Sequence, residues 1–118
     1  MKIKVLLEIA KGIKTLEKVV AGKATYAIAK NKRTIKGLVE PILETIKAMQ
    51  EKYAERDADG KTIMEGHGIK MKDLAGFEKE YKEFIEKEEE IKIHYIKEED
   101  LPKDLSVEQA DAILYFVK

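Results

Sequence analysis

The sequence contains no cysteine and only two prolines in 118 residues. The absence of cysteine excludes disulfides, thiolate zinc sites and cysteine nucleophiles together, and it suits a reducing compartment. No stretch reaches the roughly 18 uncharged apolar residues that a membrane span needs, and Glu8 interrupts the apolar start of the chain too early for a signal peptide. We therefore expect a cytoplasmic protein that is neither exported nor inserted into a membrane.

Charge is balanced overall but unevenly distributed along the chain. Apolar residues make up 44% and charged residues 39%, with 23 basic and 23 acidic side chains. The length fits a single domain over residues 1–118 with one modest core. Residues 1–37 hold ten basic and two acidic side chains. This split predicts an anion-attracting face, association between copies through unlike charges, or simple cancellation within the fold.

A first helix is predicted from Leu6 to Gly22, because apolar residues recur at steps of three and four. Its inward positions are Leu6, Ile9, Ala10, Ile13, Leu16, Val19 and Val20. Glycine at position 22 can adopt the left-handed conformation that closes a helix. Gly12 in the interior weakens the helix by roughly 1 kcal/mol relative to alanine.

The dominant prediction is a long amphipathic helix from Thr25 to Asp57. Thr25 is a good N-cap, and the apolar positions recur every seven residues over about four heptads. These positions are Ile28, Ile35, Ile42 and Met49, joined by Leu38, Val39, Ile46 and Tyr53. Pro41 cannot donate a hydrogen bond to the carbonyl of Gly37, and glycine there gives the backbone room to bend. We expect a kink between Gly37 and Pro41 without termination of the helix.

A turn and a hairpin are predicted to follow the long helix. Residues 57–60, Asp-Ala-Asp-Gly, have the composition of a turn. Residues 61–64 and 69–71 flank Glu65-Gly66-His67-Gly68, which reads as a short β-hairpin. Residues 91–95 alternate like a strand that extends this hairpin into a small sheet.

Two further helices carry clear start signals. Asp73 caps a third helix, and Ser106 with Gln109 forms the capping box of a C-terminal helix. The inward positions expected for these helices are Leu74, Phe77, Tyr81, Phe84 and Ile85, and then Ala110, Ile113, Leu114 and Val117. The predicted fold is α+β and mainly helical: a long kinked helix in an antiparallel helical hairpin, with a small β-hairpin or sheet and a C-terminal helix.

Basic side chains gather at the expected start of the long helix. The free N–H groups of a helix start attract anions. The candidate ligand-binding residues there are Lys23, Thr25, Tyr26, Lys30 and Arg33. An exposed basic helix start that binds nothing is the simpler interpretation, since basic patches are common.

No arrangement of residues predicts catalysis or a metal site. His67 and His94 are the only histidines, and they lie on separate expected elements without a third ligand. The turn at residues 57–60 resembles the start of a calcium loop, but the later ligand positions hold lysine, threonine and glycine. The carboxylates of residues 86–90 are expected to be solvated. We therefore predict a protein that is not an enzyme and uses no cofactor or metal.

Four segments, in the order in which they occur, carry a family resemblance. They are Tyr26-Ala27-Ile28-Ala29-Lys30-Asn31, Glu51-Lys52-Tyr53-Ala54-Glu55, Asp57-Ala58-Asp59-Gly60-Lys61 and Leu105-Ser106-Val107-Glu108-Gln109-Ala110. This order resembles a group of small, uncharacterised proteins from tailed bacteriophages and prophages over nearly the whole chain. Gly22-Lys23-Ala24 and the passage from Lys52 to Gly60 are faintly similar to phage anti-Thoeris proteins, oligomeric sponges for a cyclic ADP-ribose type immune signal. The basic segment departs from that family, which is arginine-rich, because it holds only Arg33.

Two hypotheses for function remain open. In the first, which the resemblance implies, a homo-oligomer sequesters a cyclic or ADP-ribose type nucleotide of the host through phosphate contacts and stacking on Tyr26. In the second, the chain is a phage structural, assembly or protein-interaction factor without a small-molecule ligand. Direct nucleic-acid binding is disfavoured, because residues 38–118 carry 21 acidic against 13 basic side chains.

Overall fold

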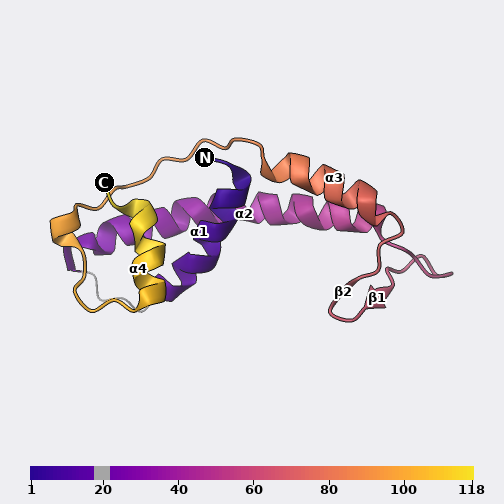
Figure 1. Cartoon of the computed structure of the whole chain (residues 1–118), viewed down its shortest axis with the longest axis horizontal. Helices are drawn as coiled ribbons and strands as arrows, with labels where there is room; N and C mark the ends of the chain where they lie inside the picture. Colours follow the sequence, from indigo (N-terminus) through magenta and orange to yellow (C-terminus); the bar gives the residue numbers. More distant parts are fainter. Residues whose placement is uncertain (18–21) are drawn as a thin grey trace.

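The computed structural model describes residues 1–17 and 22–118. Its main elements are α1 (Ile3–Ile13), α2 (Thr25–Tyr53), β1 (Met64–Glu65), β2 (Gly68–Ile69), α3 (Leu74–Ile85) and α4 (Val107–Ile113). Short 3₁₀ turns η1 (Lys14–Leu16), η2 (Gly22–Ala24), η3 (Glu98–Asp100) and η4 (Leu114–Phe116) complete it. The mainly helical α+β class, with its long helix and small antiparallel hairpin, is confirmed. Figure 1 shows an elongated molecule, 59 × 27 × 20 Å, with α2 as its spine.

The long helix α2 continues through Pro41 without interruption, as predicted. Both of its ends differ from the prediction. Ala24, and not Thr25, occupies the N-cap position, because η2 leads directly into the helix with helical backbone angles. The helix ends at Tyr53 and not at Asp57, because Glu55 leaves the helix to hydrogen-bond to two other segments. The bend at Pro41 stays a prediction.

The far half of α2 and the helix α3 form an antiparallel helical hairpin, which we call the arm (residues 39–85; Figure 1). Asp73 caps α3 as predicted, since its side chain accepts a hydrogen bond from the Gly76 N–H at 3.0 Å. No residue of α3 is fully buried, and Leu74 is 54% exposed, contrary to its predicted inward position. The reason is that α2 alone flanks this end of α3, so one neighbour covers only part of its apolar face.

The β-hairpin at the end of the arm is confirmed in a shorter form. Two residues pair on each side, Met64 with Ile69 and Glu65 with Gly68. Gly66 supplies the positive φ, 61°, that the turn needs, and His67 completes the turn. The rest of the predicted strands pairs with the exit of α2. The Glu55 N–H donates to Lys70 O at 2.8 Å, and the Ile63 N–H donates to Glu55 O at 2.9 Å.

Residues 91–95 do not extend the hairpin, so this strand prediction is wrong. Figure 1 shows the segment after α3 running back along the molecule, away from β1 and β2. Its backbone bonds instead to the body of the fold: the Ile96 N–H donates to Phe116 O at 2.6 Å. A hairpin displaced to the end of the arm is too far along the chain's long axis to accept a third strand.

The main core lies where α1, the first half of α2 and α4 meet. Its largest fully buried side chains include Ile9, Leu16, Ile35, Ile113 and Phe116. Gly12 permits the close approach of α1 to α4, because a Cβ at this position would lie 3.1 Å from the Cβ of Ala112. Gly12 therefore serves packing between helices, a role that outweighs its poor helix propensity.

The first helix is shorter than predicted. α1 ends at Ile13, with one 3₁₀ turn to Leu16, and the predicted inward positions Val19 and Val20 lie outside the described residues. Gly22 has the left-handed φ predicted for it, 53°.

The C-terminal helix has the predicted capping box of Ser106 and Gln109. Leu114, however, is 61% exposed, while Phe116 is fully buried. The backbone tightens to a 3₁₀ turn at η4, in which residues three apart share a face, so Phe116 follows Ile113 inward and Leu114 turns outward.

Candidate functional site

The five predicted ligand-binding residues lie on η2 and the first turns of α2. Lys23 is in η2, and the other four are in α2. Tyr26, Lys30 and Arg33 are spaced by four and three residues, so they share one side of the helix. Thr25 lies about 100° around the helix from Tyr26 and joins neither this side nor a capping hydrogen bond. Its predicted role as N-cap is wrong, because η2 extends the helical backbone beyond it, and its part in ligand binding stays a prediction.

Tyr26 is the centre of a small aromatic and basic cluster. The ring is 68% exposed, and Lys30 Nζ lies 5.6 Å from its centroid. The imidazole of His94 meets the ring edge to face, with 6.3 Å between centroids and an interplanar angle of 86°. Such a cluster offers a stacking surface beside positive charge, the combination that an aromatic anion favours.

Asn31 positions His94 in this cluster. The Asn31 side chain is buried, with 1% exposure, and its Nδ2 donates to His94 O at 2.9 Å. Its Oδ1 accepts from the His94 N–H at 2.8 Å. Both backbone groups of His94 are thus satisfied by one side chain, which fixes the extended segment against α2. The sequence contained a signal for this contact: Asn31 stands between Ile28 and Ile35 on the apolar seam of α2, where a polar side chain needs a partner.

The larger hollows among the described residues are lined by residues outside this cluster. A hollow of about 800 Å³ lies between α1 and α4, and one of about 570 Å³ between α1 and α2. A small-molecule site usually encloses most of its ligand in a concavity. Among the described residues, the cluster offers an exposed ring and a neighbouring ammonium group as contacts to a ligand.

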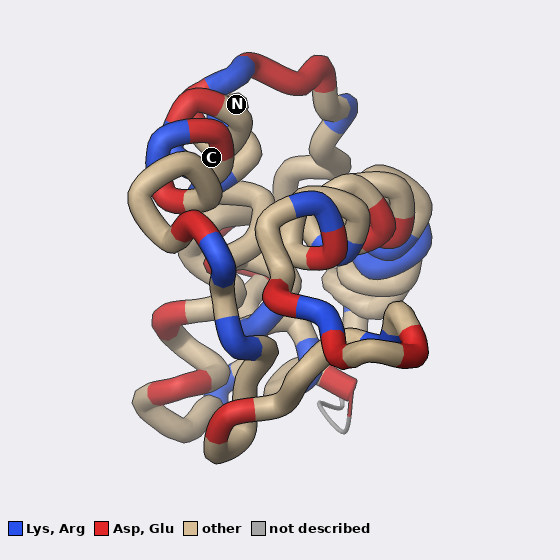
Figure 2. The backbone as a smooth tube through the Cα atoms, turned by 90° about the vertical axis from the view of Figure 1, so that its right-hand side faces the viewer, with Lys and Arg blue, Asp and Glu red and all other residues tan. Residues whose placement is uncertain are grey.

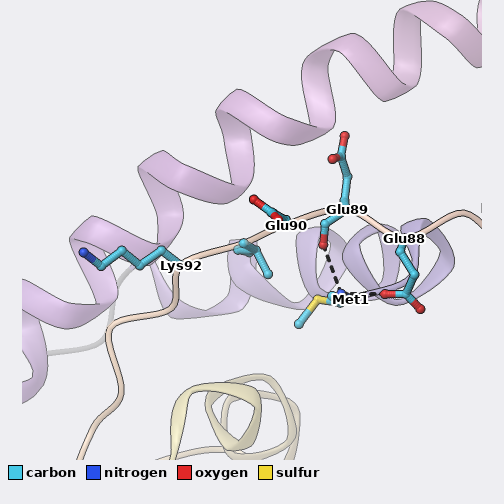
Figure 3. A pocket seen from close by; sticks show the side chains of 6 residues that line it. Met1, Glu88, Glu89, Glu90 and Lys92 are labelled. Carbon is cyan, nitrogen blue, oxygen red and sulfur yellow. Dashed lines mark hydrogen bonds and ion pairs between the residues drawn. The ribbon is translucent and has the colours of Figure 1, made fainter.

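A third hollow, of about 670 Å³, lies beside the start of the chain and is drawn in Figure 3. The Met1 amino group donates to Glu89 O at 3.0 Å and pairs with Glu88 Oε2 at 2.9 Å, as Figure 3 shows. Glu90 and Lys92 line the rest. The ion pair with Glu88 neutralises the amino group, and the other charged residues that line the hollow are Glu89, Glu90 and Lys92.

The acidic residues after α3 were predicted to be solvated, but one of them pairs with two lysines at the start of the chain. Glu86 accepts hydrogen bonds from Lys2 Nζ at 2.8 Å and from Lys4 Nζ at 2.6 Å. The bonds from Lys2 and Lys4 lower the pKa of the Glu86 carboxyl to about 2. Figure 2, an end-on view, shows acidic and basic segments interspersed around the molecule. The basic first third of the chain and the acidic remainder therefore cancel part of each other's charge, because Lys2 and Lys4 pack against Glu86.

Residues 1–17 and 22–118 contain no group of three or more histidine, aspartate or glutamate side chains placed to hold a metal ion. Within the same part of the chain, no helix is both long and apolar enough to cross a membrane.

Comparison with protein-family models, curated proteins and solved structures finds no significant match to this chain. The resemblance to phage proteins therefore stays a prediction.

Proposed function

We propose that this chain is a non-enzymatic interaction protein that binds other protein surfaces, and first of all copies of itself. The amount of exposed surface carries the proposal. The chain exposes 8563 Å², whereas a compact protein of 13.5 kDa exposes about 6,500 Å². Its radius of gyration is 18.0 Å, against about 13.5 Å for a compact domain of this length. The excess of about 2,000 Å² is as large as the area that a stable interface covers.

Apolar side chains contribute to the exposed surface on both the body and the arm. Those exposed by a third or more include Tyr26, Leu43, Met64, Leu74, Tyr95, Val107, Leu114 and Tyr115. Single exposed apolar residues are normal, but a small elongated domain that leaves this many of them open gains free energy when a partner covers them. Together with the resemblance to small phage proteins, these observations support a role in phage assembly or in interference with a host protein.

Sedimentation velocity over a wide range of concentrations, with small-angle scattering at each, tests the proposal. We expect reversible self-association in the micromolar range. A sedimentation coefficient and a radius of gyration that stay those of the elongated monomer at every concentration would overturn it.

Nucleotide binding is the second candidate function, and the position of Lys30 over the Tyr26 ring favours it. We propose that a ligand of the ADP-ribose class would stack on Tyr26 and place its phosphates near Lys30 and Arg33, with a second copy covering its other side. Calorimetry with ADP-ribose and its cyclic form tests this. We expect heat of binding that is lost in Tyr26→Ala and kept in the control Tyr95→Ala, which alters another exposed tyrosine. Absence of binding at high concentration would overturn it.

A further inference from the structure

The outward side of α1 carries a hollow along each of its edges. One hollow lies against α4 and the other against α2. Glu8 and Lys11 line both of them, so the two hollows are neighbours on a single face of the molecule. We call this the α1 face.

The hollow on the α2 side is an apolar groove with a basic rim. Its floor includes Leu7, Val39 and Ile46, together with Leu43, which is 53% exposed. Lys4, Lys11 and Lys14 line the rim, against one carboxylate, that of Glu8. Lys4 is already paired with Glu86. Lys11 and Lys14 form no ion pair with any described residue. Lys11 also lines the hollow against α4, together with Glu108 and Asp111, whereas Lys14 lines only the groove.

The α4 side of the same face has the opposite character. Val107 and Leu114 are 76% and 61% exposed, and Tyr115 is 40% exposed. Asp111 lies four residues after Val107 and three before Leu114, on the same side of the helix. Glu108 lies three residues before Asp111 and is its neighbour on the helix surface. The opposite side of α4 is already used, because Ala112, Ile113 and Phe116 are buried in the core. α4 therefore presents exposed apolar and acidic side chains beside the hollow that it shares with α1, and we call this side of α4 the ridge.

We propose that two copies of this chain pair through the α1 face, with the acidic ridge of α4 from one copy seated in the lysine-rimmed groove of the other. This inference rests on the proposed interaction function and names its surface. The signs of charge are complementary, and apolar residues meet apolar residues. The ridge and groove of one copy cannot meet each other, because α1 lies between them.

A second copy is the occupant that these surfaces fit best. Ridge and groove lie on one face, so two copies related by a two-fold axis make both contacts at the same time. A standard interface covers about 800 Å² of each partner, which the exposed surface of this elongated chain supplies with area to spare. Two matched contacts also double the number of ion pairs that fix the register of the pair.

Charge reversal of each surface tests the pairing. Lys11→Glu with Lys14→Glu makes the groove acidic, and Glu108→Lys with Asp111→Lys makes the ridge basic. Each double variant alone then faces like charge at both contacts, and we expect its self-association to weaken about tenfold or more. A mixture of the two double variants restores both contacts in a heterodimer, so we expect it to associate as tightly as the wild type. Added salt should weaken the wild-type pair and the mixture alike.

A matched control uses the same change of charge elsewhere. Lys61→Glu with Lys72→Glu alters two exposed lysines at the arm end, far from the α1 face, and should leave self-association unchanged. Circular dichroism establishes that each variant is folded, and recovery in the mixture gives a second readout that an unfolded variant cannot produce. If the wild type associates but neither reversal weakens it more than the control does, the α1 face is wrong and the proposed function stands. A wild type that stays monomeric overturns both.

Discussion

Replacement of Asn31 by alanine should destabilise the fold far more than a loss of one polar side chain on a helix usually does. The side chain is buried at 1% exposure and makes two hydrogen bonds, 2.9 and 2.8 Å long, to the backbone of His94. Asn31→Ala leaves the His94 N–H and C=O without these partners. An unsatisfied buried group costs about 1–3 kcal/mol. His94 is only half-buried, so water recovers part of this, and we expect a loss of about 2–4 kcal/mol.

Urea denaturation followed by circular dichroism measures this loss, and hydrogen exchange of the His94 amide locates it. Such a loss is a large part of the roughly 5–15 kcal/mol of stability that a domain of this kind has. Thr45→Ala is the matched control on the same helix, because the Thr45 hydroxyl is exposed and bonds only to the Pro41 carbonyl, at 2.9 Å. We expect the control to change the free energy of unfolding by no more than about 0.5 kcal/mol.

Asn31→Asp separates hydrogen bonding from packing, since aspartate has nearly the same shape. It retains an acceptor for the His94 N–H but turns the donor into an oxygen that faces the His94 carbonyl. Burial of this new carboxyl would raise its pKa, so the variant should be least stable near neutral pH and recover relative to wild type as the pH falls and the carboxyl becomes protonated. Equal stability of Asn31→Ala and wild type, or unchanged exchange at His94, would refute the role assigned to this side chain.

Three further predictions concern other contacts. Glu86→Gln should lower the melting temperature at neutral pH. The folded-state pKa of Glu86 is about 2 and its ordinary value is 4.5, so the difference in melting temperature from wild type should disappear as the pH falls from 4.5 to about 2. A difference that stays constant over this pH range would contradict the ion-pair explanation. Gly12→Val should destabilise by about 1–3 kcal/mol through overpacking against α4, and the cost should shrink when Ala112→Gly is added in a double-mutant cycle by urea denaturation. Ser106→Ala should cost about 1 kcal/mol in the same assay by removing the cap of α4, while Ser106→Asp, which retains a capping oxygen, should cost less.

Helix caps and turns, which depend on neighbouring residues, could be predicted from the sequence. The Asp73 cap and the box of Ser106 and Gln109 are present as predicted. These signals work because a capping side chain contacts N–H groups two or three residues away, within reach of the local sequence alone. The β-hairpin around Gly66 belongs to the same class, since a two-residue turn needs one residue that tolerates a positive φ.

The candidate site was only partly predictable. Tyr26 and Lys30 were found because a spacing of four residues brings them together on any helix. His94 was not predicted to join the site, although its ring lies edge to face with that of Tyr26. It is 63 residues from Asn31 and is held by hydrogen bonds with that side chain, which sequence periodicity does not reveal. Thr25 is not the N-cap that the sequence predicted, because the 3₁₀ turn η2 places the start of the helical backbone before it.

The sequence by itself determined that this protein is mainly helical, with a long apolar seam, defined caps and a charge split between its first third and the rest. These properties depend on residue type and on spacing along a regular backbone. Only the tertiary structure decided which apolar surface stays uncovered. The burial of Phe116 in place of Leu114, and the exposure of Leu74 on an arm with one flanking helix, depend on how whole elements rotate and how many neighbours each one has. Those uncovered residues carry the proposal for function, because burial is settled by contacts between distant segments and not by the hydrophobicity of a residue alone.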